Sequence, residues 1–214
     1  MGQQRLFWIV NIFEKLMPDL SFYFNKKYFI PSTRLKHWDY SSVGFYFVTI
    51  CAYQKHCYFG KIVEGEMRLS EIGKIAKKYW LEIPKHFKNT RLDEFIIMPN
   101  HIHGIIVIEY KINKTKLKNK CRDVINHVST NKNVYSQITP MGKQSLGEII
   151  RFFKAKTTYE IHQSLKTNFL WQPRFYDHII RNEKSLDEIR QYIKTNPLKW
   201  EDDEENPKNQ KNNL

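Results

Sequence analysis

Residues 92–110 have the sequence LDEFIIMPNHIHGIIVIEY, which consists of two apolar stretches joined by Pro99 and Asn100. Both stretches are rich in β-branched side chains, which favour strands, and the Pro-Asn pair between them is typical of a turn. We therefore predict a β-hairpin formed by 92–98 and 102–110. At the start of its second strand, His101 and His103 are expected to point to one face, because side chains alternate along a strand.

The segments around this hairpin carry strand and helix signals in a regular order. Residues 43–52 (VGFYFVTICA) predict a buried strand, and the apolar spacing of 71–87 predicts a helix. After the hairpin, S-x-x-E motifs mark the starts of helices at Ser145 and Ser185, with a strand-like piece between these helices. This order favours an α+β fold of the ferredoxin-like type, an antiparallel sheet with helices on one face.

The remaining segments suggest how the chain is divided. Residues 1–30 are aromatic-rich and poorly patterned, and we predict an N-terminal extension of unknown role. One domain is expected over 31–200. It contains a long basic loop at 111–143, where eight basic residues accompany one acidic residue. Residues 201–214 are polar and are expected to fray.

Composition restricts the classes of partner. The 214 residues include 35 Lys and Arg against 22 Asp and Glu, a formal net charge of +13. This excess favours a polyanionic partner, most often nucleic acid. Three cysteines without a C-x-x-C motif are typical of a reduced, cytoplasmic protein. The apolar run at 6–13 is far shorter than the roughly 20 residues of a membrane span, so no membrane partner is expected.

Two pairs of side chains are candidates for chemistry. The imidazoles of His101 and His103 could share one divalent metal ion, or they could be surface histidines on a solvated sheet face. Tyr192 and Asn196 lie four residues apart on the predicted third helix, so they project together. The residues alone favour a simpler interpretation of this second pair, in which the tyrosine packs at the rim and the asparagine ends the helix before Pro197.

Basic residues supply candidate nucleic-acid contacts. Arg174 and Arg181 lie among aromatic residues before the third helix, and Arg151, Lys154 and Lys156 lie on the second. Guanidinium groups bind phosphates through paired donors, and aromatic faces stack on unpaired bases. The alternative is that these charges belong to ordinary solvated faces. The chain has no glycine-rich phosphate-binding motif, so nothing supports a nucleotide cofactor.

Three segments together resemble the HUH-type tyrosine transposases, and among these the REP-associated tyrosine transposases. They are MPNHIHGIIVI (98–108), SLGEIIRFFKAKT (145–157) and LWQPRFYDHIIRNEKSLDEIRQYIKTNPLKW (170–200). Each motif is short, but their order and spacing are specific, and the likeness covers roughly 31–200. The resemblance implies a ferredoxin-like, RRM-like catalytic domain, in agreement with the element order.

The resemblance also implies roles for particular residues. The HUH pair aligns with His101 and His103, the third metal ligand with Asn196, and the nucleophilic tyrosine with Tyr192. The implied enzyme uses Mg²⁺ or Mn²⁺ and cleaves single-stranded DNA beside a hairpin through a 5′-phosphotyrosine intermediate. It would act in DNA transposition as a mobile-element recombinase, in the cytoplasm and associated with the nucleoid.

Two other functions stay open at this point. One is a nucleic-acid-binding module without catalysis, which recognises hairpins in DNA or RNA. The other is a metal-dependent nuclease that hydrolyses DNA with water. The extension at 1–30 and the loop at 111–143 depart from the minimal family pattern. How the protein contacts DNA, and whether it is a monomer or a homodimer, therefore also stay open.

Overall fold

The computed structural model describes residues 34–35, 37–110, 144–203 and 205–209. The chain divides into two units, Met1–Trp38 and Asp39–Leu214. Every helix and strand of the described residues belongs to the second unit. The predicted extension at 1–30 and the predicted basic loop at 111–143 lie outside the described residues.

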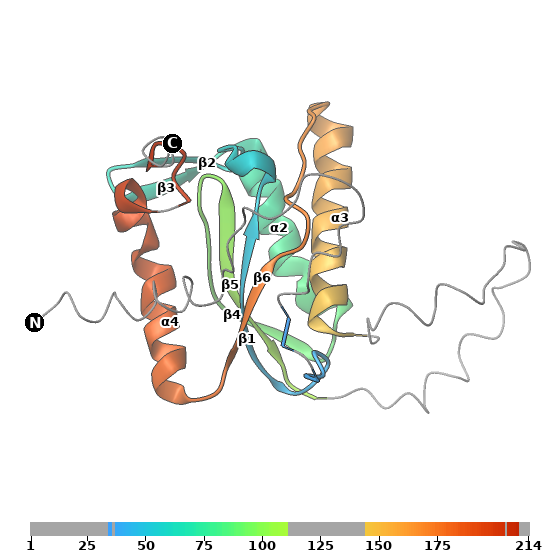
Figure 1. Ribbon diagram of the computed structural model, residues 1–214. Coiled ribbons are helices and arrows are strands. Elements are labelled where there is room, and N and C mark those ends of the chain that lie inside the picture. Colours follow the sequence, from blue (N-terminus) through green and yellow to red (C-terminus); the bar gives the residue numbers. More distant parts are fainter. Residues whose placement is uncertain (1–33, 36, 111–143, 204, 210–214) are drawn as a thin grey trace, which may run out of the picture. The chain divides into compact units, whose positions relative to one another are not determined.

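The second unit is built on a four-stranded antiparallel sheet with the spatial order β4-β5-β1-β6 (Figure 1). The strands are β1 (Gly44–Cys51), β4 (Thr90–Ile97), β5 (His101–Ile108) and β6 (Tyr176–Ile180). Along the chain, one helix separates β1 from β4 and another separates β5 from β6. This is the strand–helix–strand–strand–helix–strand order of the ferredoxin-like fold, and the predicted α+β class is confirmed.

Two helices cover one face of this sheet. They are α2 (Glu71–His86) and α3 (Leu146–Leu165), which lie side by side in Figure 1. Trp80 of α2 packs so closely on β5 that a Cβ atom at Gly104 would lie 2.3 Å from its indole ring. Only glycine permits this approach. None of the helices in the described ranges is long and apolar enough to cross a bilayer.

The third helix, α4 (Glu183–Thr195), packs on the opposite face of the sheet. Its Leu186 and Ile193 share a core cluster with Ile105 and Val107 of β5. The expectation that all helices lie on one face therefore holds for α2 and α3 but not for α4. The physical reason is that β5 is apolar on both faces and is buried along its whole length, so both faces need a cover.

The structure contains elements that the sequence patterns did not predict. A short hairpin, β2 (Gly60–Val63) and β3 (Glu66–Leu69), precedes α2. Short 3-10 helices, η1 (Tyr53–Lys55) and η3 (Asn196–Asp202), follow β1 and α4. The tail was expected to fray, but its described part folds back, and buried Asn206 donates to the carbonyl of Trp200 at 2.9 Å.

The start of α4 also differs from the prediction by two residues. The S-x-x-E motif placed it at Ser185, whereas the helix begins at Glu183. Asn182 is the N-cap, and its side-chain oxygen accepts the backbone N–H of Ser185 at 2.9 Å. Asparagine is at least as good a cap as serine, so the helix can begin after Asn182 and not at Ser185.

Candidate active site

The two histidines of β5 are buried and not on a solvated face. His101 is 0% exposed and His103 is 3% exposed, and their ring centroids are 4.4 Å apart. Burial lowers the pKa of His103 to about 3 and is the main cause that lowers the pKa of His101 well below its ordinary value. Both imidazoles are therefore neutral at physiological pH, the state in which a histidine nitrogen can bind a metal ion.

His103 is held between β1 and α4. Thr49 lies directly opposite in β1, and its hydroxyl oxygen is 2.9 Å from Nδ1 of His103. The Phe47 ring stacks on the imidazole at a centroid distance of 5.4 Å. On its other side, Nε2 lies 3.2 Å from the hydroxyl of Tyr192, which comes from α4, 89 residues later in the chain.

His101 and Asn196 each carry a buried atom that lacks a hydrogen-bond partner among the described residues. These atoms are Nε2 of His101 and Oδ1 of Asn196. Asn196 is the first residue of η3, and Trp200 of the same 3-10 helix has its ring centroid 6.2 Å from that of His101. A buried polar atom without a partner costs about 1–3 kcal/mol, so each of these two atoms is available to a ligand.

The donor set fits a divalent cation. Among the described residues, no three His, Cys, Asp or Glu side chains form a group that could hold a metal ion, so no third side chain of these types lies with His101 and His103. The amide oxygen of Asn196 is the further ligand that the resemblance implies, together with the imidazole nitrogens of His101 and His103. Imidazole and amide ligands accept several divalent ions, so the choice of Mg²⁺ or Mn²⁺ stays a prediction.

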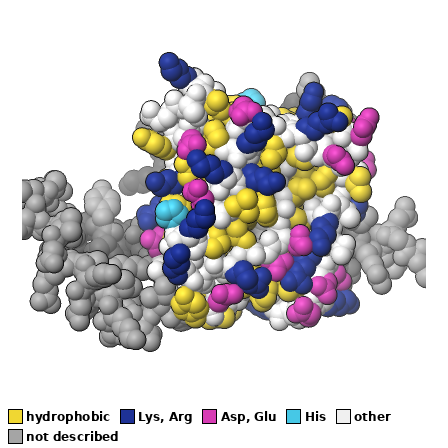
Figure 2. Space-filling view, turned by 180° about the vertical axis from the view of Figure 1, so that it is seen from behind, with side chains coloured by type: hydrophobic (Ala, Val, Ile, Leu, Met, Phe, Trp, Pro, Cys, Tyr) yellow, Lys and Arg dark blue, Asp and Glu magenta, His cyan; other side chains and the backbone are white. Residues whose placement is uncertain are grey.

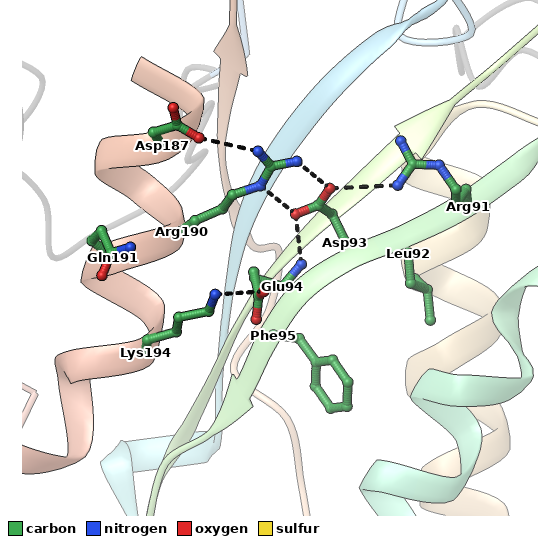
Figure 3. Close-up of a pocket in the computed structure, with 9 residues that line it drawn as sticks. All are labelled: Arg91, Leu92, Asp93, Glu94, Phe95, Asp187, Arg190, Gln191 and Lys194. Atoms are coloured by element: carbon green, nitrogen blue, oxygen red, sulfur yellow. Dashed lines mark hydrogen bonds and ion pairs between the residues drawn. The ribbon is translucent and has the colours of Figure 1, made fainter. Parts of the chain in front are cut away.

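Ion pairs hold α4 against β4 and thereby place Tyr192. Arg190 donates from Nε and Nη2 to the two carboxylate oxygens of Asp93, both at 2.8 Å, and Lys194 lies 2.9 Å from Glu94 (Figure 3). These hydrogen bonds from Arg190 hold the pKa of the Asp93 carboxyl well below its usual range. We call these two ion pairs the α4 clamp.

A β-bulge in β4 allows both acidic residues of the clamp to contact α4. The register of β4 against β5 shifts between Leu92 and Phe95, so Asp93 and Glu94 both reach α4. Bulges commonly redirect side chains in this way. The clamp was not predicted from the sequence. The sequence pattern that could have indicated it is the acidic pair Asp93 and Glu94 inside an otherwise apolar strand. Two basic residues, Arg190 and Lys194, flank Tyr192 on α4.

The predicted DNA-binding residues are spread over several elements. Lys154 donates to the backbone carbonyls of Gln172, at 2.7 Å, and Arg174, and burial lowers its pKa to about 8. It therefore braces the segment that follows α3. The other four, Arg151, Lys156, Arg174 and Arg181, are exposed. Figure 2 shows Lys and Arg scattered over one face with acidic side chains among them.

Comparison with known proteins gives two kinds of finding. No protein-family model matches the chain. The solved structure of a REP-associated tyrosine transposase bound to a REP hairpin is 17% identical, covers 78% of this chain and 74% of its own, and has a TM-score of 0.48. A proposed transposase of Deinococcus radiodurans is 13% identical, with coverages of 75% and 95% and a TM-score of 0.40. At these values the fold assignment rests on the topology of this chain, and the resemblance adds nothing about its site.

A sequence relative is much more similar. A Haemophilus influenzae protein, described only as an uncharacterized protein, is 42% identical over 174 residues, which cover 81% of this chain and 91% of that protein. With that identity over nearly the whole relative, the chain belongs to the same family as the Haemophilus influenzae protein.

Proposed function

We propose that this protein is an HUH-type tyrosine transesterase that cleaves and rejoins single-stranded DNA, as a transposase does. One observation carries the proposal: the Tyr192 hydroxyl lies 3.2 Å from Nε2 of His103. The sequence suggested a nucleophile and a metal-ligand pair in separate segments. Their meeting in one place supports a common chemical role.

In the proposed reaction, the phenol oxygen of Tyr192 attacks the phosphorus of a DNA phosphodiester. The new bond joins this oxygen to phosphorus while the bond from phosphorus to the 3′ oxygen breaks. The phenol gives up its proton as the new bond forms, and the 3′ oxygen takes up one proton and leaves as a free hydroxyl, so the protein keeps a 5′-phosphotyrosine. Because the bond energy is retained in this link, another 3′ hydroxyl can reverse the step without ATP.

A phenol with a pKa near 10 is a weak nucleophile at neutral pH, so the site must favour the transition state in other ways. His101, His103 and Asn196 would hold Mg²⁺ or Mn²⁺, which when bound polarises the scissile phosphate and offsets its charge. The protein's own contribution is orientation. The α4 clamp and the contact with His103 hold the phenol in one place, which removes part of the entropic cost of attack.

The proposed substrate is single-stranded DNA beside a hairpin. A net charge of +13 favours a polyanion with a strong dependence on salt. More than half of this charge comes from 111–143, with its eight basic residues and one acidic residue. The preference for a hairpin rests on the resemblance of the sequence motifs to REP-associated tyrosine transposases.

A covalent-trapping assay tests the proposal. The full chain is incubated with labelled single-stranded hairpin oligonucleotides and Mn²⁺ and then run on denaturing gels. We expect a protein-linked label that disappears in Tyr192→Phe and in the double variant His101→Ala/His103→Ala. Tyr159→Phe is the matched control, because Tyr159 of α3 is 65% exposed and takes no part in the site.

The other outcomes identify the alternatives. Cleavage without a protein-linked label would contradict the transesterase and favour a hydrolytic nuclease. Salt-sensitive hairpin binding without cleavage, unchanged in Tyr192→Phe, would favour a binding module.

A further inference from the structure

We propose that Asn100 is a positioning residue that sets the tautomer of His101 and so presents the Nε2 lone pair of His101 to a divalent cation. The inference rests on the proposed function, because the cation is part of that proposal. It assigns a role to a residue that sequence analysis treated only as part of a turn.

The orientation of the Asn100 side chain is determined by two backbone carbonyls. Asn100 is 1% exposed, and its Nδ2 donates to the carbonyl oxygens of Lys55 at 3.0 Å and Glu205 at 2.6 Å. A carbonyl oxygen can only accept, so the NH₂ group must face these two partners. The side-chain oxygen therefore faces His101.

This orientation determines which nitrogen of His101 carries the proton. Oδ1 of Asn100 lies 2.8 Å from Nδ1 of His101, and because an amide oxygen can only accept, Nδ1 must donate. A neutral imidazole has one N–H, so Nε2 keeps its lone pair. Nε2 of His101 is buried and lacks a hydrogen-bond partner among the described residues. Histidines that bind metal ions usually donate their other N–H to a supporting group in this way.

The support reaches into the C-terminal segment. Glu205, which accepts from Asn100 through its backbone, is also 3.1 Å from Lys55 through its carboxylate. The two backbone partners of Asn100 are thus tied to each other. The described residues 205–209 therefore help to build the site and are not a passive tail.

His103 has no neighbouring group that sets its tautomer in this way. Its Nδ1 partner is the hydroxyl of Thr49, at 2.9 Å, and a hydroxyl can donate or accept. Thr49 therefore holds the ring without choosing its tautomer. The inference is specific to His101 and predicts that Asn100 affects cation binding more than Thr49 does.

Two measurements on the full chain test the inference. Long-range ¹H–¹⁵N NMR of the metal-free protein should show His101 with its proton on Nδ1, and Asn100→Ala should move proton density to Nε2. In a calorimetric Mn²⁺ titration, Asn100→Ala should lower affinity roughly 10- to 100-fold. Asn100→Asp keeps an acceptor for His101, so the proton should stay on Nδ1, although its carboxylate can no longer donate to the carbonyls of Lys55 and Glu205.

Asn89→Ala is the matched control. Asn89 is equally buried at 1% exposed and donates to the carbonyl of Tyr110 at 3.2 Å, away from both histidines. It should leave the tautomer and Mn²⁺ affinity unchanged. If Asn100→Ala fails to fold by circular dichroism, the tautomer of wild-type His101 decides the matter: a proton on Nδ1 supports the inference, and a proton on Nε2 contradicts it.

The outcomes separate this inference from the proposed function. A proton on Nε2 of wild-type His101, or unchanged Mn²⁺ affinity in Asn100→Ala, overturns the role of Asn100 even if wild type still forms a covalent adduct. Wild type that binds no Mn²⁺ and forms no adduct overturns the proposed function, and the cation-presenting role of Asn100 falls with it.

Discussion

The two halves of the candidate site are held in place by different forces. The histidine half lies on the central strand β5 and is fixed by uncharged hydrogen bonds with Asn100 and Thr49. The tyrosine half lies on α4 and depends on the α4 clamp of Arg190–Asp93 and Lys194–Glu94, together with apolar packing. Neutral buried contacts respond little to salt, whereas partly exposed ion pairs are screened by it.

This contrast suggests that one half of the site is fixed and the other can shift. The histidine half is the fixed part, because both imidazoles are buried and stay neutral near neutral pH. The tyrosine half is the adjustable part, since a helix held by ion pairs can shift at a modest cost in free energy. Perturbations of α4 should therefore change DNA cleavage before they change cation binding.

The largest effect is expected from Tyr192→Phe, which should alter the tyrosine half of the site and leave the histidine half unchanged. Adduct formation should be lost completely, because the attacking oxygen is gone. Mn²⁺ affinity should stay the same or rise slightly, since the phenol no longer occupies Nε2 of His103. Gel assays and Mn²⁺ titration measure the two effects, and a large loss of Mn²⁺ affinity would contradict the separation.

Breaking the α4 clamp should have the next largest effect. Asp93→Asn weakens a charge-assisted, two-point contact with Arg190 and should cost about 2 kcal/mol in the free energy of unfolding. Adduct formation should slow about 10-fold, and Mn²⁺ affinity should stay unchanged. Lys74→Gln, in an exposed ion pair with Glu71, is the control and should change the free energy of unfolding by less than about 0.5 kcal/mol.

The contribution of Asp93 should depend on pH in one direction. Because hydrogen bonds from Arg190 lower its folded-state pKa, ionised Asp93 stabilises the fold above its ordinary pKa of about 3.9. That contribution is lost as pH falls below this value toward the lowered pKa. The difference in unfolding free energy between wild type and Asp93→Asn should shrink below pH about 4 in urea titrations. A difference that grows with acidity would refute the assignment.

The smallest effect is expected from Thr49→Val, which removes one hydrogen bond to His103. It should cost about 1 kcal/mol in unfolding free energy and lower Mn²⁺ affinity only a few-fold, less than Asn100→Ala. Thr157→Val is the matched control, since buried Thr157 donates to the carbonyl of Phe153 at 2.8 Å far from the histidines. Equal loss of Mn²⁺ affinity in both variants would show that Thr49 has no special role.

Local patterns predicted the fold well where local physics decides it. The side-by-side histidines followed from strand alternation, α2 followed from apolar spacing, and α3 followed from the S-x-x-E motif at Ser145. The roles of His101, His103, Asn196 and Tyr192 remain predictions, although the structure places Tyr192 against His103. The short spacing of these residues within each motif made them recognisable.

Features that depend on distant contacts were missed. The face covered by α4 depends on the second apolar face of β5, and the clamp depends on a bulge that strand alternation does not show. Asn100 looked like a turn residue because its partners, Lys55 and Glu205, are 45 residues before it and 105 residues after it. No local pattern carries such contacts.

The central claim is that Tyr192 is the nucleophile of a site built with His101 and His103. Its most direct test is to digest the trapped protein–DNA adduct and locate the attached nucleotide by tandem mass spectrometry. The account predicts a 5′-phosphate ester on Tyr192 alone, and its loss in His101→Ala/His103→Ala. Attachment to any other residue, or an adduct that persists without the histidines, would contradict it.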